Sequence, residues 1–132
     1  MGERRKSREM LLQLLFQAEL NSEKDPKTLL SRFWEKDERA EALFISIWEK
    51  RNELDHVIEE VSENWKMDRM SHVDRNILRY ASYELLYCSD VPGEVVMNEA
   101  IEIAKRYGTE NSSSFVNGIL DKIWKSRSSN TL

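Results

Sequence analysis

Residues 89–124 read SDVPGEVVMNEAIEIAKRYGTENSSSFVNGILDKIW, and they hold two apolar helical patterns with distinctive residues at their ends. Pro92 has a fixed φ and no backbone N–H, so we expect the first helix to begin near Gly93. Gly108 stands where a left-handed C-terminal cap would end that helix. The polar residues 111–114 offer N-cap side chains to the second helix. The positions at helical spacing are Val95, Val96, Ala100, Ile101, Ala104 and Tyr107, then Val116, Ile119, Leu120, Ile123 and Trp124.

The rest of the chain also has a helical pattern. Between Glu3 and Val91 there is no glycine and Pro26 is the only proline, so few residues interrupt a helix. We expect helices at about 4–20, 26–34 and 72–88, one around Leu43–Trp48 and one around Leu54–Trp65, with a connection at 21–25. The two helices around Trp48 and Leu54 can also form one bent helix, because no strong breaker separates them. No segment alternates like a strand, so we predict an all-α protein of about seven helices.

Length and composition are typical of one small domain. The chain has 132 residues, of which 40% are hydrophobic, and we treat 1–132 as a single domain with a flexible polar tail at 126–132. No run approaches the roughly 20 apolar residues that span a bilayer. The charged start leads into an amphipathic pattern, which differs from a signal peptide. We therefore expect a cytoplasmic protein with no membrane contact.

The sequence offers no group of residues suited to catalysis or metal binding. Cys88 is the only cysteine, which excludes an internal disulfide, and we expect a buried, unreactive thiol. His72 lies sixteen positions earlier on the same predicted helix, at ~24 Å and ~160° from Cys88, so the two cannot form a catalytic dyad. His56 has no companion ligands, and glycine-rich phosphate loops are absent. We expect neither an enzyme nor a bound metal or cofactor.

An ordered set of short motifs resembles the NusB family of transcription antitermination factors. These motifs are Asp90-Val91-Pro92, Asn98-Glu99-Ala100, Tyr107-Gly108, Phe115-Val116-Asn117-Gly118, Val73-Asp74-Arg75, Ile77-Leu78-Arg79, Tyr83-Glu84-Leu85 and Arg4-Arg5-Lys6-Ser7-Arg8-Glu9. Residues 21–64 match the family weakly. The resemblance implies two small helical bundles packed within one domain. It also implies an RNA-binding adaptor that pairs with the ribosomal protein NusE, binds boxA sequences of nascent ribosomal RNA and joins the RNA polymerase antitermination complex.

The start of the chain is basic although the protein is acidic. Residues 1–9 carry four cations and two carboxylates, whereas the whole chain has a net charge of −4. Cations are unfavourable at a helix N-terminus, so a function other than helix stability is indicated. A solvated leader that aids solubility is the alternative. The resemblance implies that RNA contacts are made by Arg4, Arg5, Lys6 and Arg8.

Two expectations follow from this basic start. Reversing Arg5 and Arg8 to Glu should abolish RNA binding without unfolding the protein. If four phosphates are neutralised, raising salt from about 50 to 200 mM should weaken single-strand binding roughly 50-fold.

A second apolar strip, Leu12 and Phe16, lies opposite the main stripe of the first predicted helix. It fits either a central helix packed on both sides or a protein-binding surface. The resemblance favours the surface for Phe16, because that family position belongs to the region that receives NusE.

Four further positions align with family residues implicated in partner or RNA contact. They are Asp74, Tyr107, Asn111 and Phe115. Each also has a structural explanation. Asp74 can close a capping box with Ser71, Tyr107 can cover a helix end, Asn111 can cap a helix, and Phe115 can belong to the core or stack on a base.

Positions 111 and 114 depart from the family pattern, and Trp65 has two interpretations. Many relatives carry aspartate at 111 and lysine at 114, where this chain has Asn111 and Ser114, and these departures have opposite electrostatic effects. Trp65 is a possible addition to the partner surface, although we interpret it as core.

Two other functional classes fit the sequence less well. The first is the NusB-like domain of a ribosomal RNA cytosine methyltransferase, but no cofactor-binding domain or catalytic cysteine motif follows within the 132 residues. The second is a helical interaction module that binds no RNA. A homodimer that covers residues 4–8 is a further possibility, since some relatives dimerise through their partner surface.

Overall fold

The computed structural model describes the backbone of residues 2–63 and 65–130 and the side chains of residues 4–63 and 65–126. The described residues form seven α-helices, one 3-10 turn and no strand. The helices are α1 (Gly2–Leu20), α2 (Pro26–Arg32), α3 (Glu38–Glu49), α4 (Arg51–Ser62), α5 (His72–Tyr87), α6 (Gly93–Tyr107) and α7 (Ser112–Asn130), and the turn η1 is Met67–Arg69. The all-α prediction with about seven helices is confirmed.

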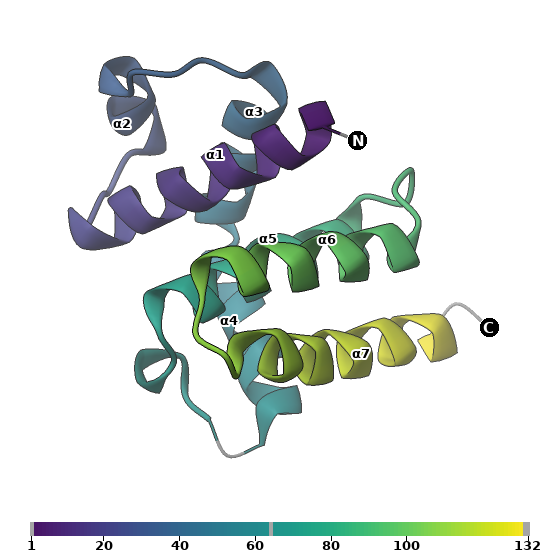
Figure 1. Ribbon diagram of the computed structural model, residues 1–132. Coiled ribbons are helices and arrows are strands. Elements are labelled where there is room, and N and C mark those ends of the chain that lie inside the picture. Colours follow the sequence, from purple (N-terminus) through teal and green to yellow (C-terminus); the bar gives the residue numbers. More distant parts are fainter. Residues whose placement is uncertain (1, 64, 131–132) are drawn as a thin grey trace.

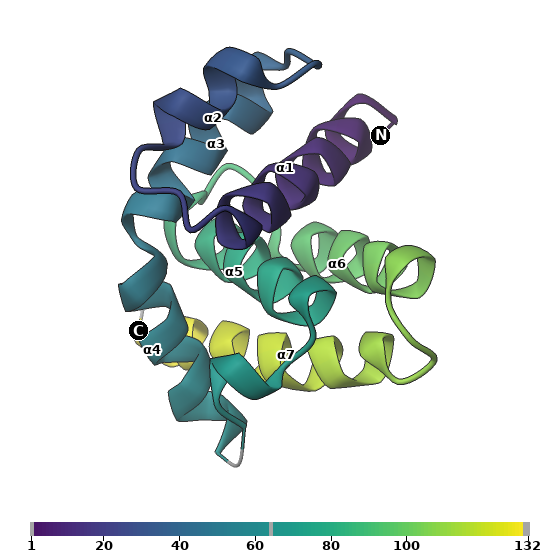
Figure 2. The same cartoon turned by 90° about the vertical axis from the view of Figure 1, so that its left-hand side faces the viewer.

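The helices form two packed groups. In Figures 1 and 2, α1, α2 and α3 lie on one side of the molecule, while α5 and α6 lie between α1 and α7. Helix α5 packs against α1 and α3 of the first group and against α4, α6 and α7 of the second. The buried apolar side chains of both groups form one continuous cluster. The core therefore runs through α5, which fixes the first bundle against the second.

Helix α1 buries its predicted stripe. Met10, Leu11, Leu14, Leu15 and Ala18 are all buried, as the helical spacing indicated. On the other strip, Leu12 is buried while Phe16 keeps 37% of its surface exposed. The second strip is thus divided between core and surface, and Phe16 belongs to the surface.

Several predicted helix boundaries need correction. Helix α2 ends at Arg32 instead of near Trp34, because Phe33 is already extended at φ −73° and ψ 137°. Helices α3 and α4 are two helices, as expected, because Lys50 at φ −99° and ψ 9° interrupts them, and the alternative of one bent helix is excluded. Helix α7 continues to Asn130, five residues beyond Lys125, so much of the predicted tail is helical. Residues 131 and 132 of that predicted tail lie outside the described residues.

Gly108 ends α6, but it does so without the left-handed conformation we expected. Its φ is −96° and its ψ is −165°, which is extended backbone open to any residue. Glycine is required here for a steric reason instead. A Cβ at position 108 would overlap the Ser112 hydroxyl and lie 2.8 Å from the Ala104 carbonyl oxygen. Ser112 Oγ accepts a hydrogen bond from the Thr109 amide at 2.9 Å and so closes the α6–α7 loop. The glycine is needed for close packing at this corner.

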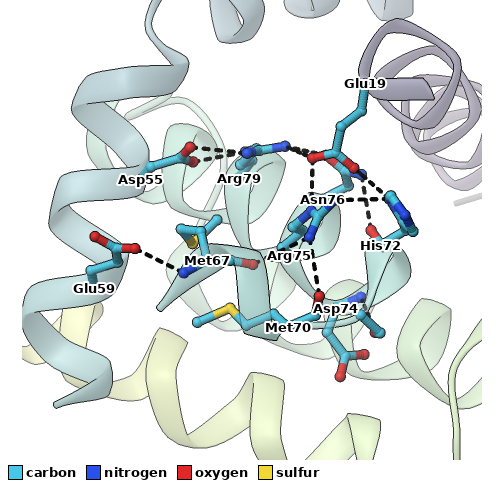
Figure 3. A network of polar contacts seen from close by, with 11 residues as sticks. Glu19, Asp55, Glu59, Met67, Met70, His72, Asp74, Arg75, Asn76 and Arg79 are labelled. Carbon is cyan, nitrogen blue, oxygen red and sulfur yellow. Dashed lines mark hydrogen bonds and ion pairs between the residues drawn. The ribbon is translucent and has the colours of Figure 1, made fainter. Parts of the chain in front are cut away.

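A network of ion pairs joins the C-terminal half of α1 to α4 and α5 (Figure 3). Glu19 accepts hydrogen bonds from Arg75 and Arg79 at 2.7 Å each and bonds the His72 ring at 2.6 Å. Arg79 also forms a bidentate pair with Asp55 of α4. Partial burial alone would raise the pKa of Glu19, but the bonds from Arg75, Arg79 and His72 lower it to about 2. The network orients α1, which presents the candidate site.

Candidate nucleic-acid and partner interface

The first turns of α1 hold the four predicted RNA-contacting cations, and the structure separates them. Arg4 and Lys6 are exposed and line an open hollow of about 500 Å³ together with Ser7 of α1 and Asp37, Glu38 and Arg39 at the start of α3. Ser7 Oγ donates a hydrogen bond to Asp37 Oδ2 at 2.7 Å, which fixes α3 beside this turn. Arg4 and Lys6 are therefore presented to solvent on a rigid support.

Arg5 is partly exposed and faces α6. Its Nε and Nη2 donate to the two carboxylate oxygens of Glu99 at 3.0 and 2.7 Å. These hydrogen bonds and the charge of Glu99 raise the pKa of Arg5, and the same bonds lower the pKa of Glu99. A phosphate group must therefore compete with Glu99 for this guanidinium.

Arg8 lies in the interior, unlike the surface position that an RNA contact needs. Its side chain is 2% exposed and forms a bidentate pair with Glu84, which is fully buried, at 2.9 and 2.8 Å. Burial alone would lower the pKa of Arg8, but Glu84 outweighs this effect and raises it. An Arg8→Glu substitution would place a carboxylate against Glu84 and Glu99. The expected charge reversal at Arg5 and Arg8 is therefore unsuitable as a test of RNA binding, because it should unfold the protein.

An apolar hollow of about 240 Å³ lies beside the middle of α1. It is lined by Glu9, Leu12, Gln13, Phe16, His72, Val73 and Tyr107. The Phe16 ring contacts the His72 ring edge-on, with 5.5 Å between centroids, and Tyr107 is 43% exposed at the end of α6. Two predicted partner residues from distant parts of the chain, Phe16 and Tyr107, thus face the same hollow.

A second hollow of about 310 Å³ lies beside the start of α5. Its lining consists of Trp65, Arg69, Met70, Ser71, Asp74, Asn111 and Phe115. The structure therefore brings together the other three predicted partner residues, Asp74, Asn111 and Phe115. His72 and Val73 line the first hollow, and Ser71 and Asp74 line the second, so the two hollows adjoin across the first turn of α5.

The contacts in the second hollow show how Asp74, Asn111 and Phe115 are placed. Ser71 Oγ accepts from the Asp74 amide at 3.1 Å, but one Asp74 oxygen is enclosed without a hydrogen-bond partner in the described structure. Asn111 is exposed, and Ser112 supplies the side-chain bond that closes the loop. Phe115 packs partly against the core. Asp74, Asn111 and Phe115 all retain polar or apolar surface that can bind a partner.

Trp65 is on the surface, which corrects our interpretation of it as core. It is 48% exposed and makes an edge-on contact with the Phe115 ring at 5.9 Å between centroids. Helix α4 ends at Ser62, and Glu63 with φ 59° turns the chain away before Trp65 can enter the core. Sequence reasoning assigned no role to His72 or Val73 in the first hollow or to Arg69 in the second. Val73 belongs to the motif Val73-Asp74-Arg75, whereas the signal for His72 and Arg69 was their proximity to Asp74 in the sequence.

The arrangement suits binding better than catalysis. In the part of the chain that the structure describes, no group of three His, Cys, Asp or Glu side chains can hold a metal ion. Cys88 is half-buried instead of buried, and its surroundings raise its pKa, so the thiol stays protonated at neutral pH. No helix among residues 2–63 and 65–130 is long and apolar enough to cross a bilayer. The described surface carries two apolar hollows and, at the first turns of α1, the exposed cations Arg4 and Lys6.

Comparison with known proteins decides the family. Residues 5–125 match the model of the NusB family. The chain belongs to the NusB family. A relative from Desulfosudis oleivorans named transcription antitermination protein NusB is 44% identical over 137 residues, which cover 95% of this chain and 87% of the relative. Transcription antitermination by NusB proteins involves no catalysis, and the expectation of a non-enzymatic protein is confirmed.

Solved structures of the NusB family share the fold. The structure of T. maritima NusB has a TM-score of 0.85 and 42% identity, with 98% of this chain and 97% of that chain covered. A chain in the crystal structure of the antitermination factors NusB and NusE in complex with double-stranded RNA has a TM-score of 0.80 and 27% identity, with 96% and 98% covered. The two-bundle NusB architecture implied by the sequence motifs is thereby confirmed.

Proposed function

We propose that the protein is an RNA-binding transcription antitermination adaptor that pairs with NusE and binds boxA elements of nascent ribosomal RNA. The strongest support is that all five predicted partner residues, which come from four parts of the chain, line two adjoining hollows. They are Phe16, Tyr107, Asp74, Asn111 and Phe115. A similar chain occurs in a complex of NusB and NusE with RNA. The cytoplasm, where such transcripts are made, is the proposed compartment.

Arg4 and Lys6 provide the principal contacts to the RNA backbone in this proposal. Both are exposed at the first turns of α1, whereas Arg8 is buried and acts in the core. Arg5 joins when a phosphate displaces it from Glu99. Phe115 lies at the first turn of α7, where its ring can stack on an unpaired base.

The apolar hollow around Phe16 receives the protein partner. An apolar side chain of NusE would fill the space between Phe16, Leu12 and Tyr107 and remove that surface from water. In the second hollow, the exposed Asn111 side chain offers the partner both a hydrogen-bond donor and an acceptor. A second copy of this chain can occupy the same surface, so a homodimer would compete with NusE.

The RNA contact at the start of α1 and the NusE contact at the Phe16 hollow reinforce each other. When NusE is docked, its own RNA contacts and those of α1 act on one RNA molecule, so the second contact forms at a high effective concentration. The protein alone should bind weakly. If Arg4 and Lys6 neutralise two phosphates, raising salt from about 50 to 200 mM weakens single-strand binding roughly 7-fold, well below the roughly 50-fold expected for four cations.

The decisive experiment is fluorescence anisotropy of a labelled boxA-like RNA, with a scrambled RNA as control, in the presence and absence of NusE. The test variant is Arg4→Glu with Lys6→Glu. Its matched control is Lys24→Glu with Lys27→Glu, which changes the net charge equally at exposed positions beyond the other end of α1. We expect the test variant to lose boxA binding and the control to retain it.

Each result has a distinct meaning. Selective boxA binding that NusE strengthens supports the adaptor. Equal binding to both RNAs, or none with NusE present, contradicts it and favours a helical interaction module without RNA. Equal losses in the two charge variants would show that overall charge, and not the start of α1, controls binding. Sedimentation over a concentration series, with and without NusE, tests the competing homodimer.

A further inference from the structure

The segment between α2 and α3 exposes a large aromatic side chain that the proposed function does not use. Trp34 is 71% exposed, the largest exposed fraction among the large hydrophobic side chains that the structure describes. Its ring stacks on Phe33 with 4.2 Å between centroids and 25° between planes, and Phe33 is itself 5% exposed. One face of the indole therefore rests on a buried ring. The indole is held in place while much of its surface remains available to solvent.

This segment is fixed at both ends. Lys36 Nζ donates to the Leu30 carbonyl at 2.7 Å, which folds the chain back on α2. Asp37 caps α3 through the Ala40 amide at 2.9 Å and accepts from Ser7 of α1 at 2.7 Å. The backbone bond with Ala40 and the bond with Ser7 lower the pKa of Asp37, so it stays ionised at neutral pH. Trp34 is thus displayed on a short, anchored connection.

The anchored segment is continuous with the basic start of α1. Trp34 lies three positions before Asp37, so their Cα atoms are at most about 11 Å apart. Asp37 lines the hollow that also contains Arg4, Lys6 and Arg39. In Figure 1 the connection from α2 to α3 passes along the top of the molecule toward the N-terminal end of α1. A nucleic acid bound at Arg4 and Lys6 can therefore extend to the indole.

We propose that Trp34 is a stacking platform for an unpaired base of the bound RNA, next to the nucleotides held by Arg4 and Lys6. Aromatic rings beside cations form the usual platform for single strands, because every base has a face that can stack. This inference rests on the proposed RNA binding and extends it to the α2–α3 connection. The bound RNA strand would run from α1 across the start of α3 to Trp34.

The charges around Trp34 favour a nucleic-acid strand only where cations can reach its phosphates. Glu35, Asp37 and Glu38 oppose an anion, while Lys36 and Arg39 attract it, so residues 34–39 carry a net charge of −1. The Lys36 ammonium has three donors and keeps two of them beyond its bond to Leu30. Stacking at Trp34 therefore contributes mainly through the ring, and its effect should depend little on salt.

The test compares Trp34→Ala, Trp34→Phe and wild type for binding to two labelled RNAs, one limited to the boxA-like core and one extended by several nucleotides at each end. Loss of one stacked base should weaken binding of the extended RNA roughly 5- to 150-fold, with Trp34→Phe in between and little change for the core RNA. Leu20→Ala, another exposed apolar residue at the far end of α1, is the matched control. Circular dichroism should show that all four proteins fold alike.

The outcomes separate this inference from the proposed function. If wild type binds boxA selectively and Trp34→Ala binds each of the two RNAs as tightly as wild type does, the stacking platform is refuted while the adaptor stands. If Trp34→Ala weakens NusE binding but not RNA binding, the residue serves a protein partner and the inference is again overturned. If wild type binds neither RNA with NusE present, the proposed function itself fails. A loss confined to the extended RNA supports the platform.

Discussion

The buried pair of Arg8 and Glu84 gives the sharpest test of the structure, because the sequence motif and the tertiary structure assign Arg8 opposite roles. Replacing Arg8 by Ala removes both hydrogen bonds to Glu84, whose side chain is fully buried. The nearest remaining cation is Arg39, whose Nη2 lies 3.7 Å from Glu84 Oε1. A buried carboxylate that loses its main partner costs about 3–5 kcal/mol. This is a large part of the roughly 5–15 kcal/mol that stabilises a typical domain.

The assay is urea unfolding of wild type, Arg8→Ala and the double variant Arg8→Met with Glu84→Leu. The double variant removes both charges and keeps similar volume, so it should recover most of the stability lost by Arg8→Ala. RNA binding by the double variant should stay close to that of wild type. An Arg8→Ala protein that loses less than about 1 kcal/mol of stability, yet binds RNA at least tenfold more weakly, would refute the interior role of Arg8.

Three further predictions concern other parts of the structure. Glu19 has a folded-state pKa of about 2 against a usual 4.5, so its contribution of about 3 kcal/mol to stability is complete above pH 4.5 and disappears as the pH falls toward 2. When unfolding is measured at pH 5 and at pH 2.5, the free energy of unfolding should fall less in Glu19→Gln than in wild type. Gly108→Ala should destabilise the protein by roughly 1–3 kcal/mol, because the added Cβ overlaps Ser112. Gly118→Ala, whose Cβ meets no atom within 4 Å, should stabilise helix α7 by roughly 0.5–1 kcal/mol. Equal shifts of the two variants in thermal melts would contradict the packing role of Gly108. Phe16→Ala should weaken NusE binding at least tenfold while lowering stability by only about 1 kcal/mol, because the ring is already partly exposed. The control is Tyr87→Ala, an exposed ring at the C-terminal end of α5, away from the hollow at the start of that helix. A loss of 3 kcal/mol or more for Phe16→Ala would place the Phe16 ring in the core.

Local patterns were enough to predict most of the secondary structure. The buried stripe of α1 follows from apolar residues three and four positions apart, and α6 begins at Gly93 after Pro92 as its ring chemistry predicts. The break at Lys50 was left open, because no glycine or proline marks it. Gly108 was located correctly as a helix end, but its conformation depends on the Ser112 side chain packed against it.

The sequence alone determined that this chain is helical, how its helices begin and end to within a few residues, and which short motifs place it near a known family. Only the tertiary structure decided which charged and aromatic side chains remain outside. Arg4 and Arg8 stand one helical turn apart in the same basic run, yet Arg4 faces water and Arg8 meets Glu84, a residue 76 positions away. Likewise, the Trp65 side chain remains 48% exposed, after a turn of the backbone at Glu63 with positive φ. Helical periodicity reports the face on which a residue lies, whereas burial depends on which distant element packs against that face.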